Sequence, residues 1–402
     1  MKDSFALHRR AQDAIAQGYL TNSKRPQSHV KGVYPSHVKG GLGCKLFGHD
    51  GRSYTDFICG LGTNLLGYGN ERIAAAMQAE LRNGYCHSFA THHEVEAAEK
   101  LKELFPFVDA VKFLKTGSEA CLAAVKIARA STGRARVLSA GYHGWGDEFV
   151  SLTPPAFGCS GRAYTYELGG GYEIDDETAA VIVEPVITDA SDARRAWLQE
   201  LRETCTKHGT LLIFDEVITG LRWPRFSVSA HWSITPDLIV LGKALGGGMP
   251  LAAVGGRYDV MNRGEYFISS TYAGETLSLV AAKTAMTLLQ TKYDLAVLWE
   301  KGQAFLDQFN AIAPGLVRID GYPTRGAFKG ALLTKALFFQ EMCEAGVLFG
   351  PSWFFSFPLA EESHGVLQAC RDVLTRIANG QVTLRGELPS SPFAEQVRAG
   401  KS

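Results

Sequence analysis

The sequence has no excess of charge of either sign. Its 402 residues include 41 Lys and Arg and 41 Asp and Glu, so the formal net charge is zero. Proteins that bind nucleic acid or an anionic membrane through their overall charge usually carry a basic excess. We therefore expect no nucleic acid and no membrane among the partners, and a small molecule as the substrate.

Paired cysteines and zinc motifs are also missing. The eight cysteines are scattered and form no CxxC pair: Cys44, Cys59, Cys86, Cys121, Cys159, Cys205, Cys343 and Cys370. Reduced, buried thiols are the expected state. His87, His92, His93 and Glu94 lie close together in the sequence, but their spacing gives neither HExxH nor another zinc motif. We expect no bound metal.

No segment indicates secretion or membrane insertion. Residues 1–20 are charged and have the pattern of an amphipathic helix, without the apolar core and cleavage site of a signal peptide. A cytoplasmic protein is therefore expected. The longest apolar stretch, Leu238–Gly256, is almost long enough to span a bilayer, but it contains Lys243 and six glycines. A cation among glycines indicates a buried site instead.

Short apolar runs alternate with helical patterns through the middle of the chain. Six of them lack polar alternation: Val111–Leu114, Arg136–Ser139, Ala180–Glu184, Leu211–Phe214, Leu238–Leu241 and Ala252–Gly255. Such runs are typical of strands buried on both faces. They predict an α/β fold with a mainly parallel sheet and helices on both faces.

The chain ends have a different pattern. An Asp-Gly turn inside Lys45–Phe57 predicts a hairpin, and residues 1–60 are expected to form a helix and an antiparallel segment. Residues 61–290 would form the large domain and 291–402 a smaller one, with helices at 293–312, 336–345 and 362–379. The aromatic segment VLFGPSWFFSFPL could stack on a sugar ring, but packed core is the simpler interpretation.

Polar residues follow several of the expected strands. Ligands of open α/β sheets bind beyond the carboxyl ends of the strands. Thr116, Gly117 and Ser118 follow one strand and open a helix, where free N–H groups and the positive end of the dipole suit a phosphate. The alternative is an ordinary capping box formed by Thr116 and Glu119.

Asp215 and Lys243 each follow a buried strand. A carboxylate at the position of Asp215 needs a cation, which a protonated ring nitrogen could supply; a helix cap or a Mg²⁺ ligand is the alternative. Loss of hydration lowers the pKa of a lysine such as Lys243, which frees the amine to attack a carbonyl. A structural lysine whose stem lies on apolar surface is the alternative.

Tyr142 and His143 stand between Gly141 and Gly144 after another strand. An aromatic ring between glycines can lie flat on a planar cofactor. Alternatively, Tyr142 belongs to the core and His143 is a hydrogen-bonded polar residue.

These segments together resemble one family. KTGSEA, GYHGWGD, IVEPV, FDEVITGLR, PDLIVLGKALGGGMPLAAVGGR and STYAGET are similar to class-III aminotransferases that depend on pyridoxal 5'-phosphate (PLP). The resemblance covers roughly Phe47 to Ala282. It implies PLP-dependent transferase fold type I, with a large domain built on the sheet and a smaller α+β domain from the two chain ends.

The resemblance also implies roles for single residues. Lys243 would carry the cofactor as an aldimine and then move a proton between the substrate carbon and the cofactor carbon. Asp215 would hold the protonated ring nitrogen. Further cofactor contacts are expected from Thr116, Gly117 and Ser118 at the phosphate, Tyr142 on the ring, His143 beside it, and Thr271, which family members lend to the phosphate across a dimer interface. A homodimer with shared active sites follows.

Within the family, the pattern around Ile218 is most similar to the branch that contains glutamate-1-semialdehyde 2,1-aminomutase and β-amino-acid aminotransferases. In the aminomutase, an arginine of an N-S-x-x-R segment binds the substrate carboxylate. Arg25, after Asn22-Ser23-Lys24, is the candidate here.

Two departures argue against a simple aminomutase. The stretch Val150 to Gly171 is shorter than the aminomutase's gating loop, and Glu275-Thr276 replaces the usual Asn-Pro or His-Pro. We therefore expect transfer of an amino group from a donor, an amino acid, to a small carbonyl acceptor. The alternatives are an intramolecular aminomutase, another PLP reaction such as racemisation, or a PLP-binding scaffold, which the presence of both Lys243 and Asp215 disfavours.

Overall fold

The chain forms two compact units. The computed structural model describes residues 2–152, 158–159, 164–363 and 365–390. Unit 1 comprises Met1–Asn70 and Val297–Ser402, and unit 2 comprises Glu71–Ala296. The chain therefore leaves unit 1 once and returns to it.

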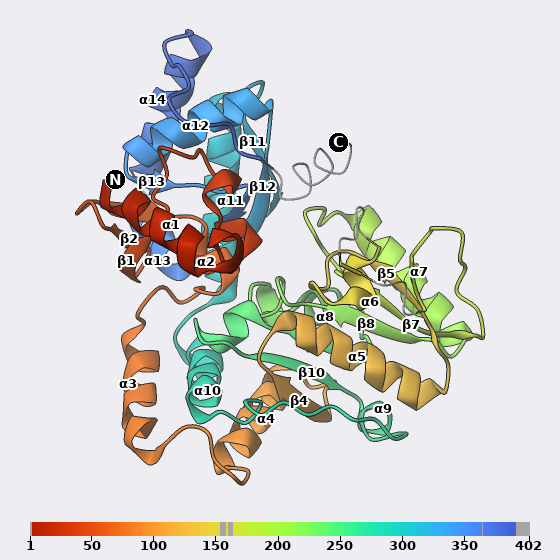
Figure 1. Cartoon of the computed structure of the whole chain (residues 1–402). Helices are drawn as coiled ribbons and strands as arrows, with labels where there is room; N and C mark the ends of the chain where they lie inside the picture. The colour runs from red at the N-terminus through yellow and green to blue at the C-terminus, as the bar shows by residue number, and fades with distance from the viewer. Residues whose placement is uncertain (1, 153–157, 160–163, 364, 391–402) are drawn as a thin grey trace. The chain divides into compact units, whose positions relative to one another are not determined.

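A seven-stranded sheet forms the centre of unit 2 (Figure 1). Its strands, in spatial order, are β4 (Ala110–Leu114), β10 (Ala252–Gly256), β9 (Leu238–Leu241), β8 (Leu211–Asp215), β7 (Thr178–Val183), β5 (Arg136–Ala140) and β6 (Thr165–Glu167). Strands β9, β8, β7, β5 and β6 pair in parallel. Strand β10 is antiparallel to both of its neighbours.

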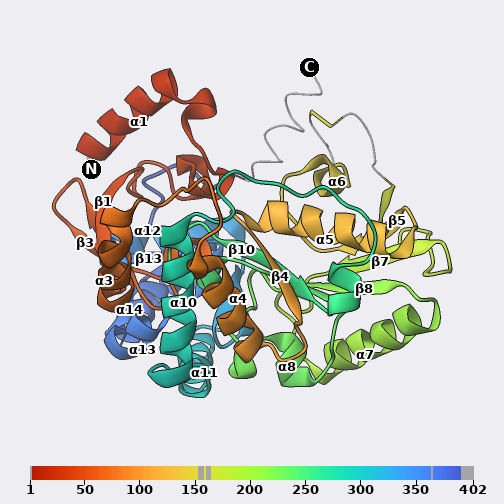
Figure 2. The same ribbon diagram turned by 90° about the horizontal axis from the view of Figure 1, so that it is seen from below.

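Helices cover both faces of this sheet. Figure 2 shows α5 (Gly117–Thr132) and α7 (Asp192–Lys207) on opposite sides of it. Every residue of β7, β8, β9 and β10 is buried, as expected for strands covered twice. The mainly parallel α/β fold predicted from the apolar runs is confirmed. Strand β6, Thr165-Tyr166-Glu167, was not expected because it is short and has no apolar run.

Further helices complete unit 2. They are α3 (Glu71–Glu80), η4 (Leu81–Asn83), α4 (His92–Leu104), α6 (Asp147–Val150), η5 (Pro224–Phe226), α8 (Val228–Trp232), η6 (Lys243–Gly246), α9 (Tyr258–Met261) and α10 (Thr276–Thr291). The limits of α5 follow from its sequence. Thr116 and Glu119 form a capping box at its start, and Gly133 ends it with φ 70°, a left-handed conformation that favours glycine.

Unit 1 joins the two ends of the chain in one sheet, as the red and blue ribbons of Figure 1 show. Its first sheet has the order β1 (Val38–Leu42), β2 (Lys45–Gly48), β3 (Ser53–Asp56) and β13 (Val347–Leu348), and its second the order β11 (Arg318–Tyr322), β12 (Arg325–Lys329) and β14 (Ser352–Phe354). The hairpin predicted around the Asp-Gly turn is the pair β2–β3. Because β13 pairs in parallel with β3, the smaller α+β domain from both chain ends is confirmed.

The helices of unit 1 are α1 (Lys2–Ala14), η1 (Ala16–Gly18), η2 (Asn22–Lys24), η3 (Pro26–Ser28), α2 (Cys59–Gly62), α11 (Leu295–Ile312), α12 (Leu332–Glu344), α13 (Phe357–Glu362) and α14 (Val366–Ala378). The last helix expected at 362–379 is α14, which begins four residues later than expected. The chain forms α13 and α14 there, and Gly365, a poor helix former, lies at the start of α14.

All eight cysteines are free thiols, as expected, and six are buried. Cys86 is exposed and Cys159 partly exposed, so the expectation of burial is wrong for these two. Both lie in connecting segments, outside the helices and strands that form the cores. Within the described residues, we find no helix that combines the length and the apolar character needed to cross a membrane.

Aromatic rings fill the core of unit 1. Phe349, Trp353 and Phe355 are almost completely buried, and Trp353 stacks on Phe305 with ring centroids 5.6 Å apart. The aromatic segment near the C-terminus is therefore packed core. Phe309 of α11 has no exposed surface.

Replacing Phe309 by Ala should destabilise unit 1. Its ring lies against those of Phe328 and Phe338, each 5.7 Å away between centroids. Removing a buried Phe side chain costs about 3–5 kcal/mol of unfolding free energy. Urea unfolding measures the loss. On the same helix, Val297 is 45% exposed, and Val297→Ala should change the unfolding free energy by less than about 0.5 kcal/mol. Equal unfolding curves for both variants would contradict this account of the core.

Candidate active site

Asp215 and Lys243 follow neighbouring parallel strands of unit 2. Asp215 is the last residue of β8 and pairs with Val240 of β9, and Lys243 begins η6 directly after β9. The backbone of Lys243 is left-handed, with φ 43°. That conformation costs a non-glycine residue of order 1–3 kcal/mol and is found mainly at functional sites.

Three donors surround the buried carboxylate of Asp215. The backbone N–H of Val217 donates to Oδ1 at 3.0 Å. The thiol of Cys121 donates to Oδ2 at 3.3 Å, and Nδ1 of His143 lies 2.7 Å from the same oxygen. Burial by itself raises the pKa of Asp215, but the hydrogen bond and charge of His143 outweigh it and hold the pKa below the usual value of a carboxyl. Asp215 is therefore an anion in a nearly dry environment.

Lys243 has the opposite tendency. Burial lowers the pKa of its ammonium group below the ordinary value, although the carboxylates of Asp215 and Glu184 act in the other direction. A lower pKa increases the fraction of free amine, which is the nucleophilic form.

The start of α5 faces this region. Thr116 accepts the N–H of Glu119 at 3.2 Å, and Oε2 of Glu119 accepts the N–H of Thr116 at 2.9 Å, so the capping box exists. The box does not use the N–H groups of Gly117 and Ser118, which have no partner inside the helix. The capping and the phosphate interpretations of this segment are therefore compatible.

The loop after β5 packs on the same helix start. A side chain at Gly144, whose φ is 106°, would come within 2.2 Å of Ser118 Oγ. Only glycine allows this approach, which places the loop that carries His143 against the start of α5. Tyr142 is 67% exposed, so its interpretation as a core residue is wrong. His143 has Nδ1 on Asp215, while its buried Nε2 makes no hydrogen bond within the described part of the chain.

Thr271 is exposed and lies in a segment that an ion pair joins to the residue before the start of α5. Glu275, four residues later, caps α10 by accepting the N–H groups of Leu277 and Ser278 at 2.8 and 3.2 Å. It also receives Nζ of Lys115 at 3.1 Å. The Glu275-Thr276 departure from the family pattern is thus a helix cap joined to the residue before Thr116.

Arg25 lies in unit 1, and its contacts are with residues of that unit. It is buried, and its guanidinium donates to the carbonyl of Ser390 at 2.8 Å and to Ser28 Oγ at 3.3 Å. Binding of a substrate carboxylate by Arg25 stays a prediction.

Sequence reasoning assigned no role to two residues of this site. Cys121 was one of eight scattered cysteines, yet it stands one helical turn after Gly117 and so faces the same side of α5. Glu184 follows β7, and its Oε1 accepts the N–H of Tyr142 at 2.8 Å. Its place after a buried strand, like that of Asp215, was the signal that could have found it.

These groups fit PLP. The ionised Asp215 suits a protonated ring nitrogen, the amine of Lys243 suits an aldehyde carbon, and the unused N–H groups of Gly117 and Ser118 suit a phosphate. The described residues of unit 2 thus supply groups that suit the ring nitrogen, the aldehyde and the phosphate of the cofactor.

Comparisons with known proteins agree with this fit. The family model "Aminotransferase class-III" matches residues 27–163 and 159–358. Glutamate-1-semialdehyde 2,1-aminomutase of Syntrophobacter fumaroxidans is 31% identical over 385 residues, which cover 84% of this chain and 89% of that protein. The same enzyme of Dechloromonas aromatica is 31% identical over 395 residues, or 87% of this chain and 92% of that one.

Solved structures agree in fold. The PLP internal aldimine form of the FumI protein of Sphingopyxis sp. MTA144 has a TM-score of 0.85 at 23% identity, covering 96% of this chain and 99% of that one. Fold type I is thereby confirmed. The chain belongs to the class-III aminotransferase family and is an enzyme whose cofactor is PLP.

Proposed function

We propose that this enzyme transfers an amino group from an amino donor, an amino acid in the first place, to a small carbonyl acceptor, with Lys243 as the residue that binds the cofactor and moves the proton. One observation carries the proposal: a lysine with a lowered pKa and an ionised carboxylate follow two adjacent parallel strands. When bound, PLP withdraws electrons from the substrate carbon.

Lys243 is suited to proton transfer. As a free amine it would accept a proton from the substrate carbon, and as an ammonium it would donate that proton to the second carbon of the transfer. The carboxylates of Asp215 and Glu184 favour its charged form while burial disfavours it. Burial, the larger effect, lowers the pKa of Lys243 toward the free amine that accepts a proton, and the two carboxylates favour the ammonium that donates one.

Asp215 keeps a ring nitrogen protonated. Its negative charge is held by His143 and by the N–H of Val217, so it cannot turn away to find other donors. Burial and the neighbouring carboxylate raise the pKa of Cys121 well above its usual range, which leaves that thiol protonated and able to donate. Cys121 and His143 therefore act as positioning residues for Asp215.

Two further contacts belong to the proposal. Gly117 and Ser118, with Thr116 beside them, bind the cofactor's phosphate, and Tyr142 stacks on its ring. The exposure of Tyr142 supports the second of these, because a ring packed in the core could not receive a cofactor. An open ring next to a glycine is free to stack.

A homodimer is part of the proposal. Four aromatic side chains of two contacting segments are exposed by more than half: Tyr85, Phe89, Phe267 and Tyr272. The segments touch where the N–H of Thr276 donates to the carbonyl of Tyr85 at 2.9 Å. Exposed aromatic rings on two adjoining segments favour an interface with another chain, and Thr271 lies in the same segment as Tyr272. A partner's phosphate at Thr271 fits this surface.

The second candidate is an intramolecular aminomutase, which the names of the two curated relatives favour. The two reactions use the same groups and differ in what leaves the site: the aminotransferase releases the oxo acid of its donor, whereas the aminomutase retains its diamine intermediate. The short stretch Val150 to Gly171, on which the sequence distinguishes them, includes residues 153–157 and 160–163, which lie outside the described residues. A cytoplasmic location is also proposed, since all eight thiols are free.

The half-reaction distinguishes the two candidates. PLP-saturated protein mixed with L-glutamate, without an acceptor, should lose the absorption of the aldehyde-derived cofactor and release 2-oxoglutarate in equal amount. Stopped-flow spectra and an oxo-acid assay measure both, and D-glutamate is the matched control. No release from L-glutamate or any other amino acid, together with isomerisation of glutamate-1-semialdehyde, would reject the first candidate and support the aminomutase.

Lys243→Ala should abolish turnover, by at least about 10³-fold, while the protein still folds and binds PLP without a covalent bond. Borohydride should fix the cofactor to the wild type and not to the variant, as mass spectrometry would show. The exposed Lys207 at the end of α7 provides the control Lys207→Ala, with unchanged activity. Borohydride labelling of a different lysine would exclude Lys243 as the cofactor's attachment site.

Phe89→Asp should convert the dimer to monomers and weaken PLP retention, since it places a charge in an apolar interface and removes the partner's Thr271. Light scattering after size exclusion measures the mass. Tyr258, 66% exposed on α9, supplies the control Tyr258→Asp, which should stay dimeric. A wild-type protein that is monomeric at all concentrations would refute the shared site.

A further inference from the structure

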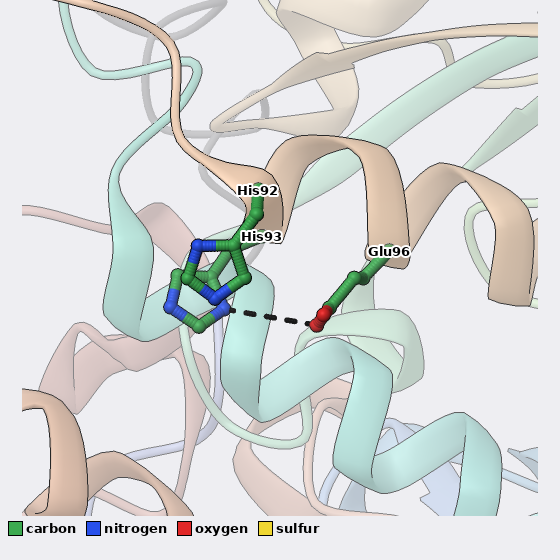
Figure 3. Close-up of side chains that lie close together, drawn as sticks. All are labelled: His92, His93 and Glu96. Carbon is green, nitrogen blue, oxygen red and sulfur yellow. Dashed lines mark ion pairs between the residues drawn. The ribbon is translucent and has the colours of Figure 1, made fainter.

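Two imidazoles and a carboxylate converge at the start of α4, apart from the cofactor groups. Figure 3 shows His92, His93 and Glu96 on the first turns of this helix, with the two rings together and the carboxylate facing them. The ring centroids of His92 and His93 are 3.9 Å apart. One ligand atom of each residue lies within 4.8 Å of one atom of each of the others.

No direct hydrogen bond closes this group. His93 Nδ1 lies 4.0 Å from Glu96 Oε2, and His93 Nε2 lies 3.6 Å from Oε2 of Glu80, at the end of α3. Both distances exceed that of a hydrogen bond. His93 is largely buried, with a side chain 10% exposed. An ion between Nδ1 and Glu96 would therefore break no hydrogen bond between these two groups, which need only a small side-chain shift to coordinate it together.

We propose that His92, His93 and Glu96 bind a divalent transition-metal ion, with Zn²⁺ as the fitting species. Two imidazoles with one carboxylate form a donor set suited to Zn²⁺, whereas Mg²⁺ and Ca²⁺ take oxygen ligands. Glu80 Oε2 lies 3.6 Å from Nε2 of His93, where its negative charge favours a proton on Nε2 and so leaves Nδ1 as the ligand atom. Carboxylates behind a metal-bound histidine have this orienting role.

Lys283 is the competitor at this position. Its Nζ lies 2.6 Å from Glu96 Oε2, and this bond keeps the pKa of Glu96 below its usual value. The Lys283 side chain is 41% exposed, so the ammonium group can return to water at small cost when an ion arrives. The Lys283 ammonium group therefore competes with the metal ion for Glu96, which weakens metal binding without preventing it.

The helix start explains why spacing did not reveal this group. Glu94, which the sequence placed beside the histidines, is used in the capping box with Thr91. Glu96, two residues further, lies on the face of the histidines, and Glu80 comes from another helix. The ion would be held by α4 alone, and Glu80 at the end of α3 would face the bound His93 from the other end of residues 81–91.

The test uses tag-free holoenzyme, treated with chelator and then titrated with Zn²⁺ in a calorimeter. We expect one ion per chain and a rise in melting temperature with Zn²⁺. His93→Gln and Glu96→Gln should each weaken binding by at least about 100-fold, and Glu80→Gln by about 10–100-fold. His87→Gln, at a histidine whose Nε2 meets the carbonyl of Asn83, is the control and should bind as the wild type does.

Lys283→Met should tighten Zn²⁺ binding, because it removes the competing charge, and misfolding cannot imitate a gain of affinity. Cys121, His143 and Asp215 also lie close enough to hold an ion, but the cofactor uses that site. Zn²⁺ binding that survives in His93→Gln, or that is unchanged in Lys283→Met, would overturn the proposal. Absence of binding by the wild type at millimolar Zn²⁺ would overturn it as well.

Discussion

The arrangement of unit 2 depends on one buried negative charge. An unpaired carboxylate in a dry interior is too costly to persist, so Asp215 at the end of β8 must be surrounded by donors. Val217 supplies one from the turn after the strand. The others, His143 and Cys121, come from the loop after β5 and from α5. Three segments far apart in the sequence must therefore meet at a single side chain.

Close packing at that point requires residues without side chains. Gly144 lies against Ser118, and Gly117 and Gly242 both lie against Val217, where an added Cβ would come within 3.0 and 3.3 Å of its methyl groups. The glycines that suggested a phosphate-binding loop and a lysine pocket thus also allow the donors to reach Asp215. The charge and the packing constrain each other, and the strained backbone of Lys243 is held in the same place.

The sequence predicted those features that depend on burial and order along the chain. Strands buried on both faces are continuous apolar runs, so six of the seven strands of the sheet were found, and strand ends located Asp215 and Lys243. Strand β6 has no such run and was therefore not predicted. The break between α13 and α14 depends on the local backbone conformation near Gly365, which the apolar pattern does not specify. The contacts of Cys121 and His143 with Asp215 could not be predicted, because they arise from how α5 and the loop after β5 pack against the end of β8.

The capping box of α5 shows why two interpretations of one motif need not compete. A helix start has more free N–H groups than one cap can satisfy. Thr116 takes that of Glu119, the third residue of the helix, and this fixes the direction of the first turn. The N–H groups of Gly117 and Ser118 then point out of the helix end with no partner in the helix, together with the positive end of its dipole. The cap therefore orients the N–H groups that an anion would bind. The capping box supports the phosphate interpretation of this segment and does not compete with it.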